Sequence, residues 1–107
     1  MAKYLVKVAY SQEGIKGVLS GGGSARVAAV ERALSGVGGS LESFYFAFGT
    51  DDVYVVADLP SHAAAVAFAG AVTASGAVDK YETVVLLTPA EVDQARDITV
   101  DYAPPGS

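Results

Sequence analysis

The sequence has no cysteine, no tryptophan and a single histidine, His62. Without cysteine the chain can form no disulfide, hold no thiolate metal site and use no cysteine nucleophile. One histidine also excludes a multi-histidine metal site within a single chain. We therefore expect neither a metal site nor a cofactor.

Positive charge is scarce as well, because seven Lys and Arg stand against twelve Asp and Glu and give a net charge of −5. The basic residues are spread from Lys3 to Arg96 and form no cluster that could follow a phosphate backbone, so we expect no nucleic-acid partner. The N-terminus enters a strand pattern directly and shows no signal-peptide architecture, which favours a cytoplasmic protein.

Residues 59–78 contain no Lys, Arg, Asp or Glu, over a length that matches a membrane-spanning helix. The stretch includes Pro60 near its start and consists mostly of Ala, Gly, Ser and Thr, so its hydrophobicity is weak. We therefore expect a buried, Ala-rich packing helix and no membrane contact.

What the sequence does contain is a regular succession of strand and helix signals, in a chain whose 107 residues fit one domain. Residues 4–10 alternate with period two and predict a strand. A short helix capped by Ser11 and a longer helix capped by Ser24 follow, separated by the glycines 21–23. The longer helix has its apolar residues at helical spacing: Val27, Val30, Leu34 and Val37.

The second half begins with strands over 41–48 and 52–59, joined by the short turn Gly49-Thr50-Asp51. Pro60 ends the second strand because proline cannot donate to the ladder. Ser61 then caps the Ala-rich helix, which Gly76 ends. Its predicted buried stripe and the residues beside it are Ala65, Val66, Phe68, Ala69 and Val72.

A fourth strand over 79–87 precedes the sharpest local signal, Thr88-Pro89-Ala90-Glu91. Thr at the cap, Pro at the first helical position and Glu at the third form a capping box, which predicts a helix to about Asp97. We assign residues 1–97 to the domain and residues 98–107 to an extended C-terminal tail.

This order predicts an α+β fold, a ferredoxin-like β-α-β-β-α-β sandwich with an extra C-terminal helix. Such a sheet has the strand order 4-1-3-2 with its helices on one face. The other face of a small sheet is then bare, and it needs a partner, another sheet or a ligand. We expect the two sheets of a dimer to pair there as a dimeric α/β barrel.

The period-two pattern assigns each strand residue to one face of the sheet. The face toward the helices is almost wholly apolar, and we expect it to include Phe44, Phe46 and Phe48. The opposite face mixes apolar residues with polar ones, among them Lys7, Tyr45, Tyr54 and Glu82, and it also includes Ser43, Asp58 and Lys80.

Lys7, Tyr45, Tyr54 and Glu82 are the candidate ligand-binding residues. With the strand order 4-1-3-2, Lys7 lies between Tyr54 and Glu82 on its two neighbouring strands. A few polar groups in an apolar concavity are typical of small-molecule sites. The same residues also fit an ordinary sheet surface or a dimer interface, because cross-strand Lys–Glu pairs are common there.

Three further candidates follow from single motifs. Gly22, Gly23 and Ser24 precede a helix and could, with Arg26, bind an anion, although glycine runs are also typical of flexible linkers. Asp51 and Asp52 fit a solvated hairpin tip better than a metal site. His62, in a first helical turn, would need an oriented partner to act as a base, and Asp58 is the nearest in sequence.

The hairpin 44–60, with Gly49-Thr50-Asp51-Asp52 at its turn, resembles the GYD-domain family. The resemblance also includes Tyr4-Leu5-Val6, Gly14-Ile15-Lys16-Gly17, Gly22-Gly23-Ser24-Ala25-Arg26, Ala74-Ser75-Gly76-Ala77-Val78 and Leu87-Thr88-Pro89-Ala90-Glu91-Val92. It covers about residues 4–96. The family signature is Gly-x-Tyr-Asp, and this chain has Asp51 at the position of the tyrosine.

The resemblance implies a small protein similar to dimeric α/β-barrel proteins, in which two bare sheet faces close on each other. Relatives of that wider architecture include cofactor-free monooxygenases, haem-degrading enzymes and isomerases, but a fold does not transfer chemistry. In a haem protein of this sequence, His62 would have to serve alone as the ligand. The resemblance carries no established activity.

Our leading hypothesis is a homodimer, or a higher homo-oligomer, whose sheet faces enclose a small apolar ligand or simply pack together. The alternative is a small cofactor-free enzyme, monooxygenase- or isomerase-like, with its site in the same cavity. A third hypothesis is a partner-binding module that uses the tail, residues 98–107.

Overall fold

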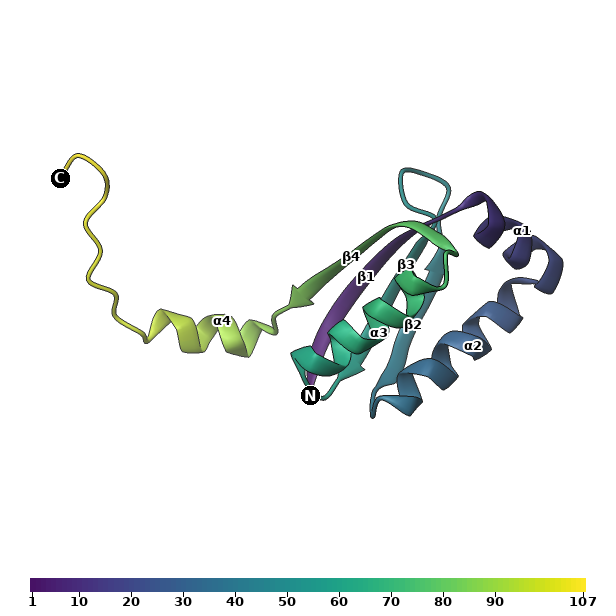
Figure 1. Cartoon of the computed structure of the whole chain (residues 1–107). Coiled ribbons are helices and arrows are strands. Elements are labelled where there is room, and N and C mark those ends of the chain that lie inside the picture. Colours follow the sequence, from purple (N-terminus) through teal and green to yellow (C-terminus); the bar gives the residue numbers. More distant parts are fainter.

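A single antiparallel sheet of four strands forms the body of the molecule, in a computed structural model that describes residues 1–107. The strands lie side by side in the order β2-β3-β1-β4, which reads 4-1-3-2 from the other edge (Figure 1). Their bounds are β1 Ala2–Tyr10, β2 Ser40–Phe46, β3 Val53–Leu59 and β4 Val78–Leu86. β1 is central and pairs with both β3 and β4.

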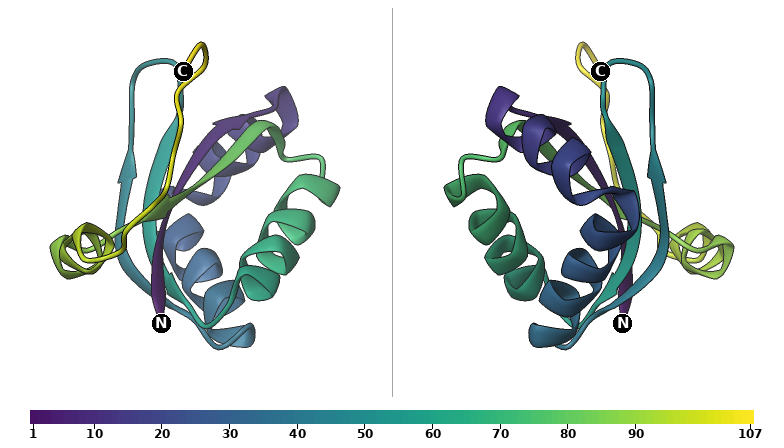
Figure 2. Two further views of the ribbon diagram at one scale, coloured as in Figure 1. Left: turned by 90° about the vertical axis from the view of Figure 1, so that its left-hand side faces the viewer. Right: turned by 90° about the vertical axis from the view of Figure 1, so that its right-hand side faces the viewer.

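Helices cover one face of this sheet and leave the other bare. Figure 2 shows α2 (Gly23–Gly36) and α3 (His62–Ala74) on the same side of the strands, with α1 (Gln12–Gly21) beside one end of α2. A fourth helix, α4 (Pro89–Arg96), lies away from the body. None of these helices has the length and hydropathy that crossing a membrane requires.

The core lies between the sheet and the two covering helices. Alternate residues of β1 and β3 are buried there, as the period-two pattern predicts, and they meet two residues from each of α2 and α3. The core residues are Tyr4, Val6, Val8, Val30, Leu34, Val53, Val55, Ala57, Leu59, Ala65 and Phe68. Each fully buried Val, Leu or Phe among them stabilises the fold by roughly 1.5–3 kcal/mol.

The turn between β2 and β3 is longer than the sequence suggests. β2 ends at Phe46 and β3 begins at Val53. The N–H of Ala47 still donates to the carbonyl of Asp52 (2.7 Å), one residue beyond the last β2–β3 pair, and the N–H of Asp52 donates to the carbonyl of Val8 on β1 (2.7 Å). The prediction that Phe48 faces the core is therefore wrong, since its side chain is fully exposed.

The orientation of α3 differs in one position from the predicted stripe. Ala65 and Phe68 are buried and Val72 packs against the core, whereas Val66 is 71% exposed. Residues three or four apart share a helix face, so once Ala65 and Phe68 face the sheet, Val66 is turned away from it.

Three predicted caps are confirmed and one is wrong. Ser11 accepts the N–H of Gly14, Ser61 accepts that of Ala64, and Thr88 forms the capping box with Glu91. Ser24 is not a cap. Gly22 occupies the cap of α2 with φ 90°, a left-handed value that glycine adopts without strain, so a single residue turns the chain from α1 into α2.

α1 is fixed to the end of α3 by backbone contacts. The N–H of Ser11 donates to the carbonyl of Ala77 (2.9 Å), and the Ser11 hydroxyl donates to the carbonyl of Gly76 (2.7 Å). Gly14 lies so close to the backbone of Ala77 that a Cβ on Gly14 would overlap the carbonyl oxygen of Ala77. A Cβ on Gly17 would meet nothing within 4 Å.

We predict opposite effects for the same substitution at these two glycines of α1. Gly14→Ala should lower the free energy of unfolding by between about 1 and 3 kcal/mol, because the overlap is with backbone. Gly17→Ala should raise it by about 1 kcal/mol through helix propensity. Urea unfolding followed by circular dichroism measures both, and equal effects would contradict the packing of α1 against Ala77.

Candidate functional site

The four predicted ligand-binding residues form one row across the bare face of the sheet. Tyr45 on β2 is paired with Tyr54 on β3, Tyr54 is paired with Lys7 on β1, and Lys7 is paired with Glu82 on β4. The predicted position of Lys7 between Tyr54 and Glu82 is therefore confirmed. Tyr45 is the most exposed of the four.

Lys7 is held by carboxylates on two sides. Its Nζ lies 3.3 Å from Oε1 of Glu82 and 3.7 Å from Oδ2 of Asp51. The hydrogen bond and charge of Glu82 raise the pKa of Lys7, with a smaller contribution from Asp51. Lys7 consequently remains protonated at neutral pH.

Asp51 is the site residue that sequence reasoning missed. It is 3% exposed, and its Oδ1 lies 3.4 Å from Nζ of Lys80 yet has no hydrogen-bond partner. The prediction of a solvated hairpin tip is therefore wrong for Asp51. We name the four residues Lys7, Asp51, Lys80 and Glu82 the charged cluster.

The neighbouring Asp52 explains the position of Asp51. In addition to its backbone bonds, Asp52 accepts the N–H of Tyr10 with Oδ2 at 2.8 Å. Asp52 is thereby fastened to the end of β1, and Asp51 lies against the lysines of the sheet. The only sequence signal for this arrangement is Lys80, which the period-two pattern places on the same face as Lys7 and which the structure pairs with Ala9.

A second ion-pair network occupies the other end of the bare face. Nζ of Lys3 lies 2.6 Å from Oε1 of Glu42 and 3.0 Å from Oδ1 of Asp58, and its hydrogen bonds to these two carboxylates, chiefly Glu42, raise the pKa of Lys3. The β2–β3 register shifts between Leu41 and Ser43, where Glu42 is the extra residue.

Between the two networks, apolar side chains cross the sheet. Leu5 of β1 is paired with Val56 of β3 and with Val84 of β4. We name Leu5, Val56 and Val84 the apolar patch. The bare face thus consists of an apolar centre between two charged ends.

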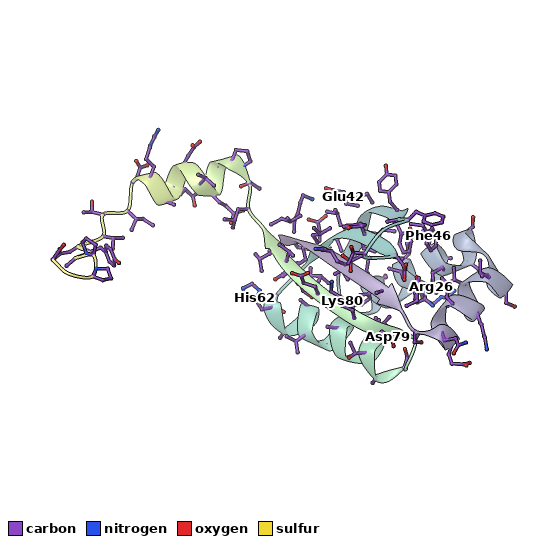
Figure 3. All side chains as sticks on the ribbon, turned by 90° about the horizontal axis from the view of Figure 1, so that it is seen from above. Arg26, Glu42, Phe46, His62, Asp79 and Lys80 are labelled. Atoms are coloured by element: carbon purple, nitrogen blue, oxygen red, sulfur yellow. The ribbon has the colours of Figure 1, made fainter.

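The predicted anion-binding residues lie elsewhere and are only partly brought together. Gly22 and Arg26 line an open groove of about 530 Å³ between α1, α2 and the turn at Gly76. Ser24 and Gly23 do not line it, and a Cβ on Gly23 would lie 3.0 Å from the ring of Phe46. Arg26 comes from α2 and Lys80 of the charged cluster from β4 (Figure 3), and Lys80 does not line this groove.

His62 lies outside both regions. Its Nδ1 is 2.7 Å from the hydroxyl oxygen of Tyr4, and the rings meet edge to face. Asp58, the partner considered from the sequence, is paired with Lys3 instead. No carboxylate therefore orients His62 as a base.

The interior offers no room for a ligand. A cavity of about 40 Å³ lies between the sheet and α2 and α3, and it is lined mostly by core side chains, a volume suited to a water molecule rather than a metabolite. Tyr81 lines it, and burial raises the pKa of Tyr81 to about 12. The bare face, with the charged cluster, is the better candidate site.

A model of the family described as GYD domain matches residues 4–95 of this chain. The match spans the sheet except the first two residues of β1, all of α1 to α3 and most of α4, and it confirms the resemblance that the sequence indicates. Comparison with curated proteins gives no match.

We predict that Glu82→Gln lowers the pKa of Lys7 toward its ordinary value of 10.5, because Glu82 is the main cause of the rise. A raised lysine pKa stabilises the folded state below the unfolded pKa, and this stabilisation is lost as the pH rises through the folded pKa. The variant should therefore show a smaller loss of stability above pH 10.5.

NMR titration of the lysine side chains measures this pKa directly. Glu42→Gln is the matched control, since it should lower the pKa of Lys3 and leave that of Lys7 unchanged. An unchanged Lys7 titration in Glu82→Gln would show that the ion pair does not form in solution.

Proposed function

Because this chain belongs to the GYD-domain family, we propose that it is a homodimeric small-molecule-binding protein. The two bare sheet faces pack on each other as in a dimeric α/β barrel, each protomer contributing a ferredoxin-like sandwich. The charged cluster of each protomer then lines the chamber between the sheets.

The composition of the bare face supports this pairing. Leu5, Val56 and Val84 expose part of their apolar surface in the monomer, and no helix of the chain covers them. Antiparallel sheets pack face to face through such side chains, at a separation of about 10 Å. The charged ends of the face then surround an apolar centre, which is the usual anatomy of an interface.

Asp51 is the observation that carries the ligand-binding proposal. A buried carboxylate oxygen without a hydrogen bond is costly, at about 1–3 kcal/mol or more for a charged group. Oδ1 of Asp51 is such an atom, since the ion pair with Nζ of Lys80 at 3.4 Å gives it charge compensation but no hydrogen bond. A ligand that donates a hydrogen bond to it removes this cost, so the site is suited to a ligand rather than to structure alone.

The chemistry of the cluster defines the ligand class. Asp51 accepts a hydroxyl or amino hydrogen, and Lys7 and Lys80 donate to a carbonyl or acidic oxygen. The apolar patch beside them suits the carbon skeleton of the same molecule. These groups favour a small amphipathic carbonyl or hydroxy compound over the wholly apolar ligand considered from the sequence.

The raised pKa of Lys7 favours a ligand-binding role over the enzymatic alternative. A lysine that acts as a nucleophile or base must lose its proton, and enzymes lower its pKa for that purpose, whereas Glu82 raises the pKa of Lys7. In a cofactor-free enzyme of this geometry, Asp51 would be the proton acceptor and Lys7 only an electrostatic stabiliser.

We predict that Val56→Glu weakens the dimer by about 100-fold in Kd, because it places a charge without a partner inside the apolar centre, at a cost of about 2–3 kcal/mol. Sedimentation velocity measures the dissociation constant, and circular dichroism checks that the variant is folded. Val66→Glu on the exposed side of α3 is the control and should dimerise as the parent does. A parent protein that is monomeric at every concentration would exclude the proposed assembly.

We also predict that the freshly purified protein retains a small ligand through Asp51. Native mass spectrometry should show a dimer with an added mass that Asp51→Asn loses. Asp79→Asn makes the same charge change at an exposed position of β4 without an ion pair and should retain the added mass. Retention of the same mass by Asp51→Asn would show that the cluster is not the binding site.

A further inference from the structure

The C-terminal part of the chain projects from the body as an arm. Figure 1 shows α4 and the residues that follow it extending away from the sheet, and no residue of α4 is buried. The arm, residues 87–107, nevertheless has large apolar side chains, each more than half exposed: Leu87, Val92, Ile98, Val100 and Tyr102. Apolar residues gathered on such an arm indicate an interaction surface.

The overall dimensions show how much surface the arm leaves unburied. The radius of gyration is 17.1 Å, against about 13 Å for a compact domain of this length. The accessible surface is 6986 Å², about 1,400 Å² more than a compact monomer of this mass exposes. A standard interface buries about 800 Å² on each partner, so the excess suffices for a stable contact.

The sequence of the arm predicts how it binds. Ile98, Val100 and Tyr102 alternate with the polar residues Thr99 and Asp101. This is the period-two pattern of a strand with one apolar face, yet these residues are unpaired in the monomer. Segments of this kind add to the free edge of a sheet, where backbone hydrogen bonds and alternate side chains both contribute.

The sheet has such an edge at β2. β2 is an outer strand that pairs only with β3, so one side of its backbone is free. Phe44 and Phe46 lie on its helix-facing side, and Phe46 is 45% exposed. Free edges accept a further strand unless they are protected, and the register shift in β2 lies before Ser43, which leaves Ser43–Phe46 regular.

We propose that residues 97–103 of one copy add as a strand to the free edge of β2 in a second copy, so that the arms are exchanged. The inference rests on the proposed sheet-to-sheet dimer. A two-fold axis along the strands places β4 of one copy opposite β2 of the other. The chain leaves β4 beside that edge, and α4 links β4 to residues 97–103. Once added to β2, the segment has Ile98, Val100 and Tyr102 continuing the apolar surface of Phe44 and Phe46.

Full-length variants with one added charge test the arm. Val100→Asp places the charge on the apolar face of the added strand and should raise the dimer Kd by at least about tenfold. Thr99→Asp places the same charge on the polar face and should leave Kd within about twofold. Both residues lie on the exposed arm, so neither variant should alter the circular dichroism of the body.

Paramagnetic labelling tests where the arm binds. The chain has no cysteine, so Asp101→Cys provides a unique site for a nitroxide label. Mixed with ¹⁵N-labelled parent protein, this copy should broaden the amide signals of Ser43–Phe46 and leave those of α3 unchanged. Broadening of α3 amides without those of β2 would overturn the assignment to the β2 edge.

The possible outcomes distinguish the exchange of arms from the pairing of the two sheets. A dimer that is equally stable in Val100→Asp and Thr99→Asp would overturn arm exchange and leave the proposed sheet pairing intact. A parent protein that is monomeric at all concentrations would overturn both. A dimer weakened by Val100→Asp alone, with broadening at β2, is the result expected.

Discussion

The attachment of Asp52 to the end of β1 is the interaction on which both the turn and the candidate site depend. Its N–H binds the carbonyl of Val8 and its carboxylate accepts the N–H of Tyr10. Hydrogen bonds to a charged group contribute about 1.5–3 kcal/mol. Asp51, the preceding residue, lies against two lysines, Lys7 and Lys80.

β1 contributes both to the core and to the charged residues of the bare face, because its two faces have different chemistry. Tyr4, Val6 and Val8 enter the core, while Lys3 and Lys7 each form an ion-pair network on the bare face. As the central strand, β1 brings β3 and β4 to either side of these lysines. The fold therefore concentrates charge at the two ends of a face whose centre is apolar.

Much of the candidate site could be predicted because strand register follows from simple periodicity. The row through Tyr45, Tyr54, Lys7 and Glu82 requires only the alternation of side chains and the order of four strands. Helix caps could be predicted for a similar reason, since Ser11, Ser61 and Thr88 act on neighbours within three residues. The period-two pattern of the strands does not extend into a turn, however, so it does not predict the burial of Asp51.

The sequence by itself determined the strands, the helices, the family and the polar row, because each depends on contacts between near neighbours or on a fixed period. Only the tertiary structure decided the burial of Asp51 and the exposure of Val66. These features depend on hydrogen bonds and packing between segments far apart in the chain, such as the hydrogen bond between Asp52 and Tyr10. The local sequence pattern does not predict such contacts, so the position of the charged cluster is known only from the folded structure.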